Sequence, residues 1–183
     1  MKKILAFAGS NSSKSINKKL IDYTATLITN SEIKVLDLQE FSAPIYSQDI
    51  QNEKGIPESI NRLLEEIKNS DAFIISTPEH NGMVTSFFKN LMDWVSRAQR
   101  KFFDDKPILL LSTSPGRGGG TRGLKNLEKL VNEFAGNVIA TFSFPSFNHN
   151  FDSEENKITD ENLLDDLKKL VKNLETEVSP ILT

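Results

Sequence analysis

Hydroxyl and amide side chains are concentrated near the start of the sequence, in residues 9–17, which read GSNSSKSIN. The segment follows an apolar run and precedes a helical pattern, so its second half is expected to open a helix. A helix N-terminus offers unpaired N–H groups and a partial positive charge, and Ser and Asn side chains add donors. The segment is therefore a candidate phosphate site, although the same residues could serve only as a turn and a helix cap.

Two glycine motifs approach known nucleotide-binding loops without satisfying them. Gly9 followed by Lys14 and Ser15 is similar to the end of a P-loop, yet the second glycine is missing and the lysine comes one residue too early. Residues 118–123 match G-x-G-x-x-G, but they follow the fourth predicted strand, whereas the dinucleotide motif belongs after the first. These glycines are better explained as places where the backbone approaches something flat or bulky.

A third polar segment, Pro78-Glu79-His80-Asn81-Gly82, places an acid beside a histidine. It lies between a predicted buried strand and a helix, and in open α/β sheets ligands bind at the carboxyl ends of the strands. Glu79 and His80 are poorly suited to act as an acid–base pair, because adjacent side chains in an extended turn diverge and no nucleophile is placed near them. The sequence also lacks a G-x-S-x-G elbow. A solvated turn at the rim of a pocket is the simpler interpretation.

Five apolar blocks alternate with helical patterns, at residues 4–8, 33–38, 72–76, 108–111 and 138–144. Helical spacing is clear in Ile16, Leu20, Tyr23 and Leu27, and Pro57 suits the first position of the second helix. This alternation predicts an α/β fold, a flavodoxin-like three-layer sandwich whose five-stranded parallel sheet has the order 2-1-3-4-5 and helices on both faces. We expect one domain over residues 1–183, in which the irregular stretches 39–56 and 145–158 are candidates for a lid or a subunit contact.

The composition excludes several classes of protein. A formal charge of −3, with Lys and Arg dispersed, gives no basic field for nucleic acid. Without Cys there are no disulfides or thiolate ligands, and the two His, His80 and His149, are too few for a His-rich metal site. The apolar run after Met1 is too short for a secretory signal, and no run has the length of a membrane helix. We therefore expect a cytoplasmic protein with no membrane partner.

The polar segments 9–17 and 78–82, together with residues 89–97 (KNLMDWVSR) and 112–119 (STSPGRGG), resemble the NADPH-dependent FMN reductase family, which includes flavodoxin-like quinone, azo and chromate reductases. The similarity covers nearly the whole chain. It implies FMN as cofactor and NADPH or NADH as electron donor, in a ping-pong reaction that passes two electrons through the flavin to a small acceptor such as a quinone, an azo compound or a metal oxyanion. It also implies a homodimer or homotetramer, with the helix of Trp94 in the dimer interface. A flavodoxin-like electron carrier, or a flavin-binding module without its own reductase turnover, is the alternative.

The resemblance also assigns residues to the FMN site. It places the phosphate on Ser10, Ser12, Ser15, the Ile16 amide and Asn17. It places the flavin ring between two walls, formed largely by backbone groups of Pro78, Glu79, His80, Asn81 and Gly82 and of Ser114, Pro115, Gly116 and Gly119. No side chain is assigned as a general acid or base, because the cofactor performs the chemistry.

Two positions depart from the family pattern. Position 12 is Ser where the family often has Arg, which removes a bidentate phosphate clamp and leaves Lys14 to act as a point charge. Position 80 is His where the family usually has Tyr, which puts an imidazole in place of a phenol at the pocket.

Overall fold

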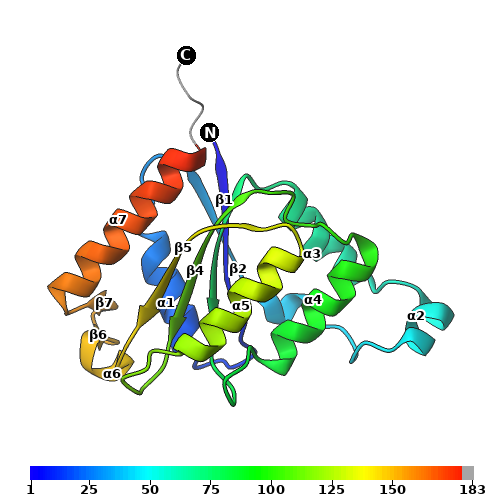
Figure 1. Ribbon diagram of the computed structural model, residues 1–183, viewed down its shortest axis with the longest axis horizontal. Helices are drawn as coiled ribbons and strands as arrows, with labels where there is room; N and C mark the ends of the chain where they lie inside the picture. The colour runs from blue at the N-terminus through cyan, green and yellow to red at the C-terminus, as the bar shows by residue number, and fades with distance from the viewer. Residues whose placement is uncertain (179–183) are drawn as a thin grey trace.

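The computed structural model describes residues 1–178, and its centre is a parallel sheet of five strands. The strands are β1 (Lys3–Ala8), β2 (Glu32–Leu36), β3 (Ala72–Thr77), β4 (Pro107–Thr113) and β5 (Asn137–Phe144), in the order β2-β1-β3-β4-β5. The predicted strand order is therefore confirmed. All carboxyl ends lie at one edge of the sheet, at the opposite end from the N-terminus (Figure 1).

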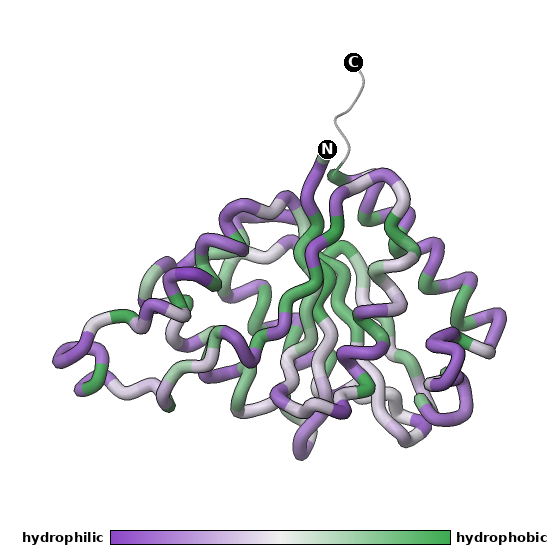
Figure 2. Tube along the Cα trace, turned by 180° about the vertical axis from the view of Figure 1, so that it is seen from behind, coloured by the Kyte–Doolittle hydropathy of each residue, from purple (hydrophilic) through white to green (hydrophobic). Residues whose placement is uncertain are grey.

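Helices cover both faces of this sheet, as predicted (Figure 1). One face carries α1 (Ile16–Ala25) and α7 (Glu161–Val178), and the other carries α3 (Glu58–Lys68), α4 (Ser86–Ala98) and α5 (Thr121–Glu133). Successive residues of a strand point to opposite faces, so Leu5 and Phe7 join the α3–α4–α5 core while Ile4 and Ala6 join the other. Figure 2 shows apolar strands in the middle and polar residues along the outer helices and loops.

Side-chain caps mark where α1 and α4 begin. The Ser15 hydroxyl accepts from the Lys18 amide at 3.2 Å and so caps α1. The Thr85 hydroxyl caps α4 by accepting from the Phe88 amide at 3.1 Å. The prediction for Pro57 was wrong by one residue, because Pro57 is the N-cap of α3 and the helix begins at Glu58.

The two irregular stretches contain short elements that the sequence patterns did not indicate. After β2, which ends at Leu36 and not at Leu38, the chain enters a 3-10 helix (η1, Leu38–Phe41), because the Asp37 carboxylate accepts from the Gln39 amide. A short helix, α2 (Gln48–Lys54), then projects from the body of the protein (Figure 1). Residues 145–158 form α6 (Phe147–Asn150) and a hairpin of β6 (Phe151–Asp152) and β7 (Lys157–Ile158). None of the helices in residues 1–178 is both long and apolar enough to cross a membrane.

Candidate functional site

Three loops that are far apart in the sequence meet at the carboxyl edge of the sheet and enclose a cleft of about 350 Å³. They are the β1–α1, β3–α4 and β4–α5 loops. The lining residues are Ser10, Ser12, Lys14, Ser15, Ile16, Asn17, Pro78, Glu79, His80, Thr113, Ser114 and Pro115. All the predicted phosphate-loop residues are among them, and so are members of both predicted walls. Asn81, Gly82, Gly116 and Gly119 do not line this cleft.

The β1–α1 loop presents unused hydrogen-bond donors to the cleft. The Ser10 hydroxyl oxygen accepts from the Ser12 amide at 3.2 Å, and the Ser12 hydroxyl oxygen accepts from the Lys14 amide at 3.3 Å. Both hydroxyls therefore keep a proton to donate. The amides of Ile16 and Asn17, in the first turn of α1, have no partner among residues 1–178. Such a set of donors is suited to an anion.

Asn17 differs from its neighbours, because its side chain is buried and holds strand ends together. Its Oδ1 accepts from the Ser76 hydroxyl at 2.7 Å and from the Thr113 amide at 3.1 Å, and its Nδ2 donates to the Thr113 carbonyl at 3.1 Å. The side chain thus joins the start of α1 to the ends of β3 and β4. The backbone amide of Asn17 has no partner among residues 1–178 and can donate to a ligand in the cleft, whereas its side chain is hydrogen-bonded inside the protein.

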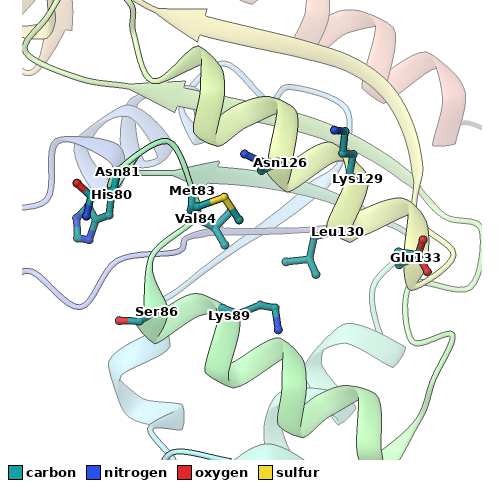
Figure 3. A pocket seen from close by; sticks show the side chains of 10 residues that line it. All are labelled: His80, Asn81, Met83, Val84, Ser86, Lys89, Asn126, Lys129, Leu130 and Glu133. Atoms are coloured by element: carbon teal, nitrogen blue, oxygen red, sulfur yellow. The ribbon is translucent and has the colours of Figure 1, made fainter.

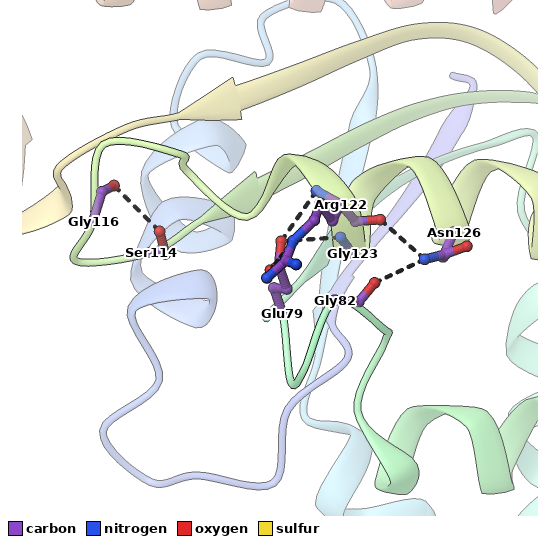
Figure 4. A network of polar contacts seen from close by, with 7 residues as sticks. All are labelled: Glu79, Gly82, Ser114, Gly116, Arg122, Gly123 and Asn126. Carbon is purple, nitrogen blue, oxygen red and sulfur yellow. Dashed lines mark hydrogen bonds and ion pairs between the residues drawn. The ribbon is translucent and has the colours of Figure 1, made fainter.

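Glu79 is not a solvated turn residue, because its carboxylate is bonded to the start of α5 (Figure 4). Oε2 accepts from the amides of Arg122 and Gly123 at 3.0 and 3.1 Å, and Oε1 accepts from Arg122 Nε at 3.1 Å. The hydrogen bond from Gly123, assisted by the Arg122 guanidinium, holds the pKa of Glu79 below its ordinary value. These bonds connect the β3–α4 loop to the helix that follows the β4–α5 loop.

The β4–α5 loop is fixed from behind by the segment that follows β5. The Ser146 amide donates to the Gly116 carbonyl at 2.9 Å, and the Phe147 amide donates to the Ser114 carbonyl at 3.0 Å. Gly119 has a positive φ of 55°, and a Cβ there would lie 3.0 Å from the Phe144 carbonyl carbon. A side chain at this position would meet β5, so glycine lets the loop turn close to the sheet.

A larger hollow of about 690 Å³ adjoins the cleft between α4 and α5 (Figure 3). His80 lies on both, exposed at the tip of the β3–α4 loop. Asn81 lines the hollow, as do the apolar side chains of Met83, Val84 and Leu130. Met83 is 54% exposed, and within residues 1–178 only Met1 and Ile45 are other large apolar side chains that are exposed.

One lining residue of the cleft was missed by sequence reasoning. Thr113 is the last residue of β4 and directly precedes the predicted Ser114, so its place at a strand end was an available signal. As for metals, residues 1–178 contain no group of three or more His, Asp or Glu placed to hold an ion.

Comparison with known proteins identifies the family. The model of the NADPH-dependent FMN reductase family matches residues 2–149. A quinone reductase of Escherichia coli (strain K12) is 31% identical over 134 residues, which cover 68% of this chain and 67% of the relative. An NAD(P)H-dependent FMN reductase of Pseudomonas aeruginosa is 31% identical over 130 residues, which cover 70% and 69%.

Solved structures share the fold. The flavoenzyme NAD(P)H:(acceptor) oxidoreductase FerB from Paracoccus denitrificans superposes with a TM-score of 0.83 over 97% of each chain, at 24% sequence identity. An FMN-dependent NADH-azoreductase from Bacillus anthracis, in complex with FMN, gives a TM-score of 0.66 at 16% identity and covers 95% of this chain and 100% of its own. The chain therefore belongs to the NADPH-dependent FMN reductase family, and it is an NAD(P)H-dependent flavin oxidoreductase with FMN as its cofactor.

Proposed function

We propose that the cleft at the carboxyl edge of the sheet is the FMN site, and that the chain acts there as one FMN-binding domain reducing small acceptors such as quinones. The observation that carries this proposal is the meeting of the three predicted loops around one cleft. When bound, FMN supplies the redox chemistry, taking hydride from a nicotinamide and passing two electrons to the acceptor. The protein contributes binding, orientation and electrostatics.

The phosphate end of the site is the β1–α1 loop. Ser10 and Ser12 donate through the hydroxyl protons that their loop bonds leave free. Ile16 and Asn17 donate through backbone amides at the positive end of α1, and Lys14 adds a full charge. Asn17 therefore binds through its backbone, while its side chain positions the loop. Ser15 lines the cleft and caps the helix that presents these amides.

The ring end of the site lies between the other two loops. Pro78, Glu79 and His80 form one wall of the cleft, and Ser114 and Pro115 form the other. Asn81, Gly82, Gly116 and Gly119 shape the same two loops without lining the cleft. Gly82 is buried with a φ of 80°, so it turns the first loop back toward α4.

We further propose that the hollow between α4 and α5 is covered by a second copy of the chain, in a homodimer or homotetramer in the cytoplasm. The hollow carries exposed Met83 and adjoins the cleft at His80, so a second copy there would close the site from solvent. Trp94 takes no part in catalysis in this proposal. It is buried in α4, and its Nε1 donates to the Pro44 carbonyl at 2.7 Å.

The phosphate placement can be tested with one charge. Ser10→Asp should repel the phosphate and weaken FMN binding by more than tenfold, about 1.4 kcal/mol, in titration calorimetry of the FMN-free protein. The matched control is Ser153→Asp, which adds the same charge on the exposed turn of the β6–β7 hairpin. Equal FMN affinity in the two variants would place the phosphate elsewhere.

Reductase activity needs a separate test. The purified protein should take up added FMN, and anaerobic mixing with NADPH or NADH should bleach the flavin absorbance rapidly. Slow bleaching would favour the alternative, an electron carrier or flavin-binding module without its own turnover. A protein that stays colourless with added FMN would refute the proposed site altogether.

A further inference from the structure

The start of α5 lacks a cap of its own and receives one from Glu79. Gly120, the residue before the helix, has a positive φ of 79° and no side chain to offer. The first-turn amides of Arg122 and Gly123 instead donate to the Glu79 carboxylate, which belongs to a different loop (Figure 4). A carboxylate at a helix N-terminus is electrostatically favourable, because it meets the positive end of the helix dipole.

Arg122 forms an ion pair with Glu79 at this contact between the β3–α4 loop and α5. Its guanidinium is bonded to Glu79 Oε1, at 3.1 Å from Nε and 2.9 Å from the terminal nitrogen Nη2. The two partners differ in exposure, since the Glu79 side chain is 16% exposed and that of Arg122 is 76% exposed. Only Glu79 lines the cleft. Glu79 therefore belongs to the lining of the cleft and is bonded to two positive groups, the helix N-terminus and the guanidinium.

The surrounding packing accommodates this carboxylate. Gly123 lies in the first turn of α5, and a Cβ there would be 3.0 Å from Glu79 Cβ and 3.2 Å from Glu79 Cα. A second bond holds the same loop against the helix, because Asn126 Nδ2 donates to the Gly82 carbonyl at 2.7 Å. Helix α5 thus carries a small residue where Glu79 approaches and an amide where the loop turns away.

We propose that Glu79 is a positioning residue that sets the reduction potential of FMN in the adjacent cleft, by cancelling the positive charge of Arg122 and of the α5 N-terminus. The inference rests on the proposed FMN site. Reduction of a flavin adds negative charge to the cleft, so uncompensated positive charge nearby favours the reduced form. With Glu79 ionised, this stabilisation is suppressed and the potential is held low.

The test uses variants that change charge and shape separately. Glu79→Gln keeps the length of the side chain and removes its charge, whereas Glu79→Asp keeps the charge and shortens the side chain. Arg122→Gln removes the opposite charge, and the double variant Glu79→Gln/Arg122→Gln restores neutrality. Glu128→Gln, further along α5, makes the same loss of charge away from the cleft and serves as the control.

The potential of bound FMN would be measured by photoreduction against a reference dye, together with the dissociation constants of oxidised and reduced FMN. Glu79→Gln should raise the potential and favour reduced FMN by roughly threefold or more. Arg122→Gln should lower it by less, because Arg122 is more exposed. The double variant should lie between the unmodified protein and Glu79→Gln, because the two charge effects oppose each other and differ in size. Glu79→Asp and Glu128→Gln should remain near the unmodified protein, even where the melting temperature of the FMN-free variant falls.

Charge and structure predict different outcomes. If Glu79 only held the loops together, Glu79→Asp and Glu79→Gln would change the potential alike, and the double variant would be worse than either single one. That pattern, or an unchanged potential in Glu79→Gln, would overturn the proposal. Failure of the proposed FMN site would be recognised separately, because Ser10→Asp and Ser153→Asp would then bind FMN equally well.

Discussion

Asn17→Ala should strongly destabilise the protein, even though the residue lies at the edge of a cleft. The substitution removes three hydrogen bonds, to the Ser76 hydroxyl and to the amide and carbonyl of Thr113. All three residues are buried, with exposed fractions of 2% or less. The Ser76 hydroxyl and the Thr113 amide and carbonyl would each lose this partner in the interior, where polar groups need hydrogen bonds.

The magnitude follows from these contacts. A buried neutral hydrogen bond contributes about 1 kcal/mol net, and a buried group left without a partner costs about 1 to 3 kcal/mol. We expect the free energy of unfolding to fall by about 3 to 4 kcal/mol in Asn17→Ala. For a domain of this size, that corresponds to a melting temperature lower by roughly 10 °C. Ser76→Ala should cost only about 1 kcal/mol, because Asn17 Oδ1 keeps the Thr113 amide as a partner.

Urea unfolding of the FMN-free protein measures these differences, provided that the m-value stays constant. Asn11→Ala is the control, since Asn11 is an exposed asparagine of the same loop, and it should change stability by less than about 0.5 kcal/mol. In the double variant Asn17→Ala/Ser76→Ala, the loss should be smaller than the two single losses together, because the residues share a bond. A loss below about 1 kcal/mol in Asn17→Ala would show that water from the cleft replaces the side chain, and the reasoning would fail.

Three further predictions concern the junctions around the cleft. Gly123→Ala should lower the melting temperature, although alanine ordinarily stabilises a helix by about 0.5 to 1 kcal/mol, because the added methyl meets Glu79 at 3.0 Å; a higher melting temperature would contradict this. Thr85→Val should cost about 1 to 2 kcal/mol in urea unfolding, since it removes the cap of the Phe88 amide and the bond to the Gly9 carbonyl, and Thr85→Ser should recover most of the loss. The pKa of Glu79 is lowered from 4.5, so the stability that its charge contributes is complete above pH 4.5 and is lost as the pH falls through the lowered value. The difference in unfolding free energy between the unmodified protein and Glu79→Gln should therefore shrink at low pH. A difference that stayed constant with pH would contradict this role of the Glu79 charge.

The fold could be predicted because the burial of each long helix and strand is visible in its local pattern of apolar residues. The strands β3 and β4 are apolar up to their last two residues, since both faces of these strands are covered, and helical spacing marks the stripes that cover them. Short elements carry little such signal. Helix α2 has no buried residue, so no apolar periodicity marks it, and the two-residue strands β6 and β7 are too short for an alternating pattern.

The cleft could be located from the sequence because a parallel sheet brings its strand ends to one edge. The hydrogen-bond partners of individual side chains could not be predicted in this way. Asn17 and Thr113 are separated by 96 residues, and Glu79 and Arg122 by 43. Nothing in the polar segment 78–82 distinguishes a glutamate that faces water from one that caps a distant helix. That distinction depends on how the loops pack together, which only the structure supplies.

In this site, the groups available to bind a ligand differ from the groups that hold the loops together. Within residues 1–178, the hydroxyl protons of Ser10 and Ser12 and the first-turn amides of α1 do not bind one loop of the cleft to another. In this protein other polar groups hold the loops, namely the side chains of Asn17, Glu79 and Thr85, and each bonds to the backbone of a neighbouring loop or strand. Substitutions at Ser12 or His80 should therefore change ligand affinity with little effect on the FMN-free protein, whereas substitutions at Asn17 should change the stability of the cleft itself.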